Sequence, residues 1–259
     1  MEAISSTRND TVKLIRSLAL KKHRTDTGLF VAEGREMLAR ARSTGWSPHT
    51  LMLRDGSDTQ ELFNWGRNAG ARCLLATEAV MKAVSGLENA GDCIALFQQR
   101  WLEALPPVAT GAVWLALENI RDPGNLGTII RTADAVSAAG LILIGQSCDP
   151  YGPDCIRATT GSIFALPLLK QSESEFSALL KAWPGETVGT ASAATTNFRR
   201  DYRTPTLLIM GSEGEGLSSS LSRLCRTLVR IPMSGGTESL NVAVATALML
   251  YEIRRNALS

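Results

Sequence analysis

The chain has 259 residues, of which 44% are apolar and 20% charged, a balance typical of a globular protein with a buried core. No apolar run approaches the roughly 18 residues needed to cross a membrane, and the first residues lack a signal-peptide pattern. The formal net charge is only +2, so charge alone does not indicate a nucleic-acid partner. We therefore expect a cytoplasmic protein with one large or two modest domains and no contact with a membrane.

Cysteine and histidine offer little metal chemistry in this sequence. The five cysteines form no Cys-x-x-Cys pair, and His23 and His49 are too few to complete a zinc site. We expect reduced, mostly buried thiols and no bound metal.

The first hundred residues alternate short helical and strand patterns, which predicts a small α/β domain over residues 1–100. Helices are expected near 12–20, 35–44 and 59–69, and strands near 29–31, 51–53, 72–76 and 94–97. Between Arg8 and Arg24 the chain sets six cations against one acid, Asp10. This stretch is either a surface for RNA phosphates or a solvated helix face, and taken alone the pattern slightly favours the solvated face.

A proline-containing stretch with few periodic apolar positions, residues 101–110, predicts a linker. Beyond it, residues 111–259 form the second predicted domain. Strands are expected at 113–117, 141–144, 187–191, 206–210 and 227–231, with a helix over 240–255. Alternation of strands and helices predicts a mostly parallel sheet covered on both faces.

Three polar or glycine-rich loops follow strands of this second domain. The first runs from Glu118 to Gly127 and leads to Arg131, the second is Gly211–Leu217, and the third joins Ile231-Pro232-Met233 to Ser239-Leu240-Asn241. Loops at the carboxyl ends of parallel strands are where α/β sheets hold ligands. The glycines of the second loop permit close backbone approach to a ligand, although they are also compatible with a plain strand-to-helix turn.

Two common nucleotide motifs do not fit the second loop. A dinucleotide fingerprint would need a third glycine where Ser219 stands, and a phosphate-gripping loop would need Gly-Lys-Ser/Thr after its glycines. The loop is therefore a poor dinucleotide fingerprint, and kinase and NTPase functions are not indicated.

Together the three loops resemble, in order, the motifs of the SpoU-type (TrmH-like) RNA 2′-O-ribose methyltransferases, a branch of the SPOUT superfamily. The resemblance spans roughly residues 111–255. It implies an α/β domain with a deep trefoil knot, a homodimer formed through this domain, and S-adenosylmethionine as methyl donor.

The resemblance also implies the residues that hold the donor. The matching cofactor positions are Gly211, Glu213, Gly216, Ile231, Pro232, Met233, Ser239, Leu240 and Asn241. Ile231 and Met233 would supply apolar walls for adenine, although such residues at a strand end are often ordinary core residues.

The catalytic positions implied by the resemblance are Asn125, Arg131, Glu213, Ser239 and Asn241. A guanidinium rarely accepts a proton, so we interpret Arg131 as a phosphate clamp that also stabilises a developing alkoxide. The proton would leave to water, to a phosphate oxygen or to a carboxylate such as Glu213. Asn125 could instead cap a helix that begins near Leu126.

Two further stretches support an RNA substrate. Gly28–Gly34 resembles the start of a substrate-binding domain, similar to certain ribosomal proteins, that often precedes SpoU domains, and Arg157–Ser162 resembles a small-residue segment between the first two motifs. The predicted RNA-binding residues are Lys21, Lys22, Arg24, Arg131 and Arg157. Ribosomal RNA is the favoured substrate; transfer RNA, methylation of a base nitrogen, and a non-catalytic RNA-binding or ribosome-assembly role are the alternatives.

Overall fold

The computed structural model describes residues 2–86, 88–237 and 239–258. The chain divides into two compact units, one of residues 1–99 with 149–165 and one of residues 100–148 with 166–259. Residues 149–165 were expected in the second domain but group with the first ninety-nine residues. Each unit has its own buried apolar core.

The first unit is built on a mixed sheet. Its described strands follow the order β1-β4-β3-β5-β2, in which β5 is antiparallel to both of its neighbours. Its elements are β1 (Glu2–Ile4), α1 (Asp10–Ser17), α2 (Lys21–Thr27), β2 (Leu29–Glu33), α3 (Arg35–Ser43), β3 (Thr50–Arg54), α4 (Gln60–Asn68), β4 (Arg72–Ala76), α5 (Glu78–Val84), β5 (Cys93–Gln98), α7 (Pro153–Thr159) and the 3-10 turn η1 (Ser162–Phe164).

An aromatic cluster attaches the 149–165 segment to this sheet. The Phe30 ring lies 4.7 Å from the Tyr151 ring and 5.9 Å from the Phe164 ring, centroid to centroid. The indole Nε1 of Trp46 donates a hydrogen bond of 2.8 Å to the carbonyl oxygen of Phe164. Because large buried rings contribute much of a small core, residues 149–165 complete this unit.

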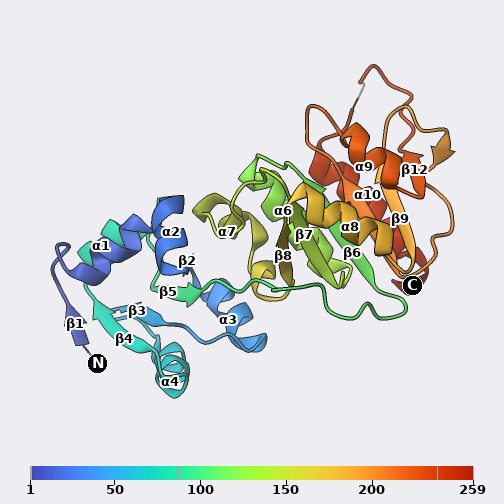
Figure 1. The fold of residues 1–259 in the computed structure, drawn as a ribbon. Helices are drawn as coiled ribbons and strands as arrows, with labels where there is room; N and C mark the ends of the chain where they lie inside the picture. Colours follow the sequence, from blue (N-terminus) through green and yellow to red (C-terminus); the bar gives the residue numbers. More distant parts are fainter. Residues whose placement is uncertain (1, 87, 238, 259) are drawn as a thin grey trace. The chain divides into compact units, whose positions relative to one another are not determined.

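The second unit contains a sheet in which every described strand pair is parallel (Figure 1). The strand order is β10-β12-β9-β11-β6-β7-β8. Its elements are β6 (Val113–Glu118), α6 (Pro123–Ala135), β7 (Gly140–Ile144), β8 (Leu168–Gln171), α8 (Glu173–Ala182), β9 (Glu186–Thr190), β10 (Thr196–Asn197), β11 (Thr206–Met210), α9 (Ser219–Leu224), β12 (Thr227–Arg230), α10 (Val242–Ile253) and the 3-10 turn η2 (Arg255–Ala257).

Helices cover both faces of the parallel sheet, as expected for buried parallel strands. On one face, side chains of α8 and α9 pack against alternate residues of the central strands, among them Trp114 of β6 and Ile209 of β11. On the other face, α10 packs against α6 and β11. Leu102, Leu105 and Val108 of the predicted linker pack against the same core as α8 and α9.

The expected mostly parallel sheet is confirmed, and most predicted elements lie within two residues of their observed limits. Several short elements were missed: β1, α2, α5, α7, β8 and β10. Within the described residues, no helix combines the length and apolar character needed to span a bilayer. Of the five cysteines, Cys93 and Cys155 are buried and the other three half-buried.

Candidate active site

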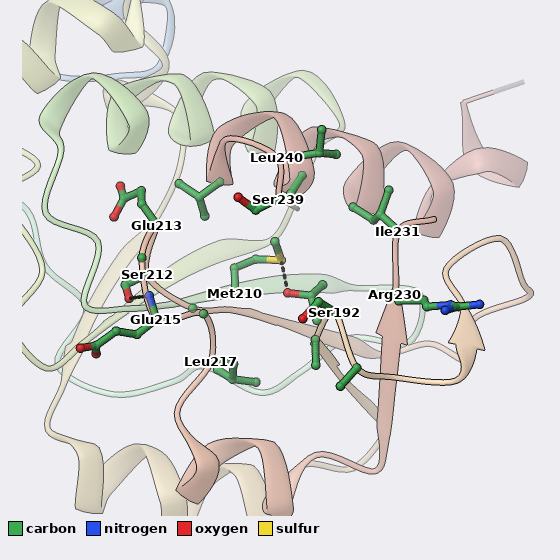
Figure 2. A pocket seen from close by; sticks show the side chains of 18 of the residues that line it. Ser192, Met210, Ser212, Glu213, Glu215, Leu217, Arg230, Ile231, Ser239 and Leu240 are labelled. Carbon is green, nitrogen blue, oxygen red and sulfur yellow. Dashed lines mark hydrogen bonds between the residues drawn. The ribbon is translucent and has the colours of Figure 1, made fainter. Parts of the chain in front are cut away.

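A pocket of about 340 Å³ opens at the carboxyl ends of β9, β11 and β12 in the second unit. Figure 2 shows Leu217, Ile231 and Leu240 around it, with Glu213 and Glu215 at one end and Arg230 at the other. The pocket is lined by Thr190, Ala191, Ser192, Ala193, Met210, Gly211, Ser212, Glu213, Gly214, Glu215, Gly216, Leu217, Val229, Arg230, Ile231, Met233, Ser239, Leu240, Val242 and Ala245.

The loop after β11 is folded tightly on itself. The backbone amides of Ser212 and Gly216 each donate to the carbonyl oxygen of the other, over 3.1 and 3.0 Å. A Cβ atom on Gly211 would lie 2.0 Å from the backbone of Gly216 and Leu217, so no larger residue fits there without moving the loop. Gly216 has a φ of +69°, which favours glycine. These constraints fix the loop that forms one side of the pocket.

A buried carboxylate ties this loop to the neighbouring strand. Glu118, at the end of β6, is buried, and its Oε2 accepts a 2.8 Å hydrogen bond from the amide of Ser218. Burial, together with the nearby Glu118 carboxylate, raises the pKa of the Cys225 thiol to about 12. Acidic side chains are seldom fully buried, so the burial of Glu118 could not be expected from its place at the start of the first loop.

Helix α6 begins three residues earlier than expected, which excludes one interpretation of Asn125. Asp122 is its N-cap and accepts a 2.6 Å hydrogen bond from the amide of Asn125, and Pro123 occupies the first turn. The interpretation of Asn125 as the helix cap is therefore wrong, because Asp122 takes that role. The Asn125 side chain is left to make other contacts.

Those contacts join the three motif loops. Asn125 Nδ2 donates to Glu213 Oε1 over 3.1 Å, and Asn241 Nδ2 donates to Asn125 Oδ1 over 2.9 Å. Asn241 is also the N-cap of α10, because its Oδ1 accepts hydrogen bonds from the amides of Ala243 and Val244. One residue from each motif thus belongs to a single hydrogen-bonded chain beside the pocket.

Most of the other predicted catalytic and cofactor residues line the pocket, and a few do not. Gly211, Gly216, Ile231, Met233, Ser239 and Leu240 line the pocket, whereas Pro232 and Asn241 do not. Arg131 lies almost two turns beyond Asn125 on α6. Its side chain is exposed and makes no hydrogen bond or ion pair to the described residues.

A fourth segment, which no sequence motif indicates, also borders the pocket. Thr190, the last residue of β9, and the next three residues, to Ala193, line the pocket, and Thr190 Oγ1 lies 3.6 Å from Met210 Sδ. The only available signal was a run of small residues after a predicted strand. Small side chains leave room for a ligand but carry no recognisable chemistry.

The predicted RNA-binding residues of the first unit differ in environment. Lys21 and Lys22 are exposed, whereas the Arg24 side chain is buried and pairs with Asp149. Arg157 is half-exposed, pairs with Asp154 and donates to the carbonyl oxygen of Gly86 over 2.9 Å. Arg24 is therefore buried in an ion pair, which contradicts its expected contact with RNA.

Comparison with known proteins identifies the class. Residues 112–251 match the SpoU rRNA Methylase family, and residues 9–95 match the MRM3-like substrate binding domain. The chain belongs to the SpoU rRNA methylase family.

Individual relatives agree over nearly the whole chain. A 23S rRNA (uridine(2479)-2′-O)-methyltransferase of Streptomyces viridochromogenes is 33% identical over 93% of this chain and 88% of its own length. The 23S rRNA (guanosine(2553)-2′-O)-methyltransferase RlmP of Bacillus subtilis is 29% identical over 98% of this chain and 100% of its own. The crystal structure of an AdoMet-bound rRNA methyltransferase from Sinorhizobium meliloti matches with a TM-score of 0.93 at 37% identity, covering 100% of this chain and 99% of that one.

Proposed function

We propose that this protein transfers a methyl group from S-adenosylmethionine to a ribose 2′-hydroxyl of ribosomal RNA. Family membership and two relatives named as 23S rRNA 2′-O-methyltransferases support the reaction and the substrate class. The observation that carries the proposal is the chain of hydrogen bonds from Asn241 through Asn125 to Glu213, which brings three distant motifs together beside one pocket.

The pocket fits the methyl donor in size and in character. Ile231, Leu217 and Leu240 offer apolar surface for a purine ring, while backbone groups of the 211–216 loop offer polar contacts at close approach. A solved relative with the same fold is described as AdoMet-bound. When bound, S-adenosylmethionine supplies an electrophilic methyl group on its sulfonium.

The protein's own contribution is chiefly to position the acceptor hydroxyl, since alignment of reactants can contribute about 7–11 kcal/mol. Asn125, held by Asn241 and Glu213, orients the ribose. Arg131 grips a phosphate beside it and stabilises the developing alkoxide. The hydroxyl proton passes to Glu213, to water or to a phosphate oxygen. Ser239 and Leu240 hold the donor beside this group of residues.

Several wider features belong to the same proposal. The carboxyl-terminal domain contains the deep trefoil knot, residues 1–100 bind the RNA substrate, and the protein acts in the cytoplasm. Lys21 and Lys22 are exposed and suited to phosphate contact, and Arg157 retains part of its surface for such a contact. Arg24 is left out of this surface because its guanidinium is buried.

The protein forms a homodimer through its catalytic domain. Val244, Leu248 and Tyr251 stand at helical spacing on α10 and are 50%, 40% and 53% exposed. A contiguous exposed apolar stripe is characteristic of an interaction surface, and a second copy of the same helix offers a matching stripe.

Two measurements test the function. Calorimetry with S-adenosylmethionine should detect one site per chain, and labelled methyl transfer to protein-free 23S ribosomal RNA should yield riboses that resist alkaline cleavage. Donor binding without transfer to any RNA would favour a non-catalytic module. Label on a base, or on transfer RNA alone, would replace the proposed acceptor.

A further inference from the structure

The corner between α1 and α2 exposes an apolar side chain. Leu20 is 61% exposed, more than any other large apolar residue that the structure describes. Its neighbours Ala19, Lys21 and Lys22 are exposed as well. An isolated exposed leucine is ordinary, so its meaning depends on what surrounds it and on how its backbone is held.

The cations beside Leu20 are available to a partner. Neither Lys21 nor Lys22 forms an ion pair with a carboxylate among residues 2–86, 88–237 and 239–258. Other lysines of the same unit are engaged: Lys13 pairs with Asp10 over 2.8 Å, and Lys82 pairs with Glu78 over 2.6 Å. The corner therefore presents two neighbouring positive charges that no described carboxylate neutralises.

A buried arginine holds the backbone of this corner. Arg24 is only 4% exposed, and its Nη1 donates to the carbonyl oxygens of Leu18 and Ala19 over 2.7 and 2.9 Å. Its Nε and Nη2 lie 2.8 and 2.7 Å from Asp149 Oδ2. Burying an ion pair costs desolvation free energy, and the best-attested role of buried pairs is to specify one conformation. Here the pair fixes the backbone of Leu18 and Ala19, which directly precede Leu20.

Asp149 is itself fixed by the core of the first unit. Its Oδ1 accepts a 2.9 Å hydrogen bond from the amide of Tyr151, whose ring packs on Phe30. The corner is thus connected, through Arg24 and Asp149, to the aromatic cluster. A rigid surface binds with less loss of conformational entropy than a mobile one.

We propose that Leu20 packs against an unpaired base of the RNA substrate while Lys21 and Lys22 contact the flanking phosphates. Arg24 and Asp149 are positioning residues that preset the corner and do not touch RNA. An apolar side chain beside two cations matches a nucleotide, which has an apolar base face beside an anionic phosphate, better than it matches an apolar protein surface. The base is unpaired because paired A-form RNA hides its base faces. This inference rests on the proposed function.

The test measures the affinity of the full-length protein for protein-free 23S ribosomal RNA across a range of salt concentrations. The Lys21→Gln/Lys22→Gln double variant should weaken binding and make the negative slope of log K against log salt shallower by about 1.4 to 1.8, as expected for two lost phosphate contacts. Leu20→Ala should weaken binding about fivefold with the slope unchanged, since apolar packing against a base releases no counterions. Lys82→Gln and Leu258→Ala are the matched controls and should behave like the unaltered protein.

A fully paired RNA duplex tests the contribution of Leu20 separately, because it offers phosphates but no accessible base face. There Leu20→Ala should bind as tightly as the parent, because no base face is accessible. Equal losses for Leu20→Ala on duplex and on ribosomal RNA would overturn the assignment of an unpaired base. Unchanged binding of ribosomal RNA by both the lysine and leucine variants would overturn the whole inference.

Asp149→Asn distinguishes the effect of a fixed backbone at this corner from the effect of net charge on RNA binding. This variant makes the protein more positive, so electrostatics alone would tighten RNA binding, whereas a loosened corner should weaken it about threefold or more. Thermal melting verifies that the variant is folded. If Asp149→Asn is unfolded, the RNA affinity of Leu20→Ala tests the inference instead, because that variant alters only an exposed side chain. A parent protein that binds neither S-adenosylmethionine nor RNA refutes the proposed function, whereas active variants indistinguishable from the controls refute only this inference.

Discussion

The side chains of Asn125 and Asn241 are hydrogen-bonded over 2.9 Å although 116 residues separate them in the chain. Asn125 lies in the first turn of α6 and Asn241 caps α10, so the contact joins the start of two packed helices. Each side-chain amide also makes a second contact, because Asn125 donates to Glu213 and Asn241 accepts from the first turn of α10. The pair therefore couples the predicted acceptor side of the site to its cofactor loops.

This pair allows catalysis to be separated from folding. Asn241→Asp keeps an oxygen for the helix cap but removes the Nδ2 donor to Asn125. We expect kcat to fall about a hundredfold, as for loss of one preorganised donor, while the free energy of unfolding changes by less than about 1 kcal/mol. Asn241→Ala should lose both activity and about 1 kcal/mol of stability. Equal activity of Asn241→Asp and the parent would contradict a role for the Asn125 contact.

Gly211 and Gly214 make a matched pair for the cofactor loop. A Cβ on Gly211 meets backbone at 2.0 Å, whereas a Cβ on Gly214 meets nothing within 4 Å. Gly211→Ala should weaken S-adenosylmethionine binding at least about thirtyfold, because the clash displaces the loop rather than a flexible side chain. Gly214→Ala should bind within about twofold of the parent. Calorimetry on both variants checks this, and similar affinities would show that the tight loop is not needed for the donor.

Arg131 is predicted to act through the geometry of its guanidinium. Arg131→Lys keeps the charge but loses the planar pair of donors that grips a phosphate. We expect kcat to fall at least tenfold at neutral pH, with donor affinity unchanged because Arg131 does not line the pocket. Single-turnover methylation at saturating donor measures this. Near-full turnover of the lysine variant would reject the bidentate clamp.

Much of the second unit could be predicted because its strands are buried on both faces. Continuous apolar runs such as Val113–Leu117 and Thr206–Met210 stand out in such strands, and the observed limits agree closely. β8 was missed because it is short, follows Pro167 and ends in Lys170 and Gln171. The strand pattern thus located the loops that border the pocket.

Other features depend on contacts between distant residues and could not be inferred from local pattern. Arg24 looked like one more exposed cation until its pairing with Asp149, 125 residues away, placed it in the interior. The grouping of 149–165 with the first unit rests on ring contacts such as Phe30 with Tyr151. Thr190 to Ala193 carry no distinctive side-chain chemistry, so only the pocket itself identifies them.

Two thiols, the buried Cys93 and the half-buried Cys225, should make the protein lose stability in alkaline solution. Burial is the main cause that raises the pKa of both Cys93 and Cys225 from 9.0 to about 12. The unfolded thiols release protons near pH 9 while the folded ones do not, so the free energy of unfolding falls as the pH rises from about 9 towards 12. At pH 10 the loss is about 1.4 kcal/mol for each thiol. Between pH 8 and 10, urea unfolding of Cys93→Ala/Cys225→Ala should therefore show about 3 kcal/mol less loss than the parent; an equal loss would contradict it.

The exposed stripe on α10 predicts the oligomeric state. If Val244, Leu248 and Tyr251 form the dimer contact, Leu248→Glu places a charge within an apolar interface and should shift the protein to monomer at micromolar concentration. Leu20→Glu, which adds the same charge at an exposed apolar position of the other unit, is the control and should remain dimeric. Light scattering coupled to size exclusion gives the mass of each variant. A Leu248→Glu variant that remains dimeric would place the interface elsewhere, because a buried unpaired glutamate costs several kcal/mol. A parent that is already monomeric would contradict the homodimer itself.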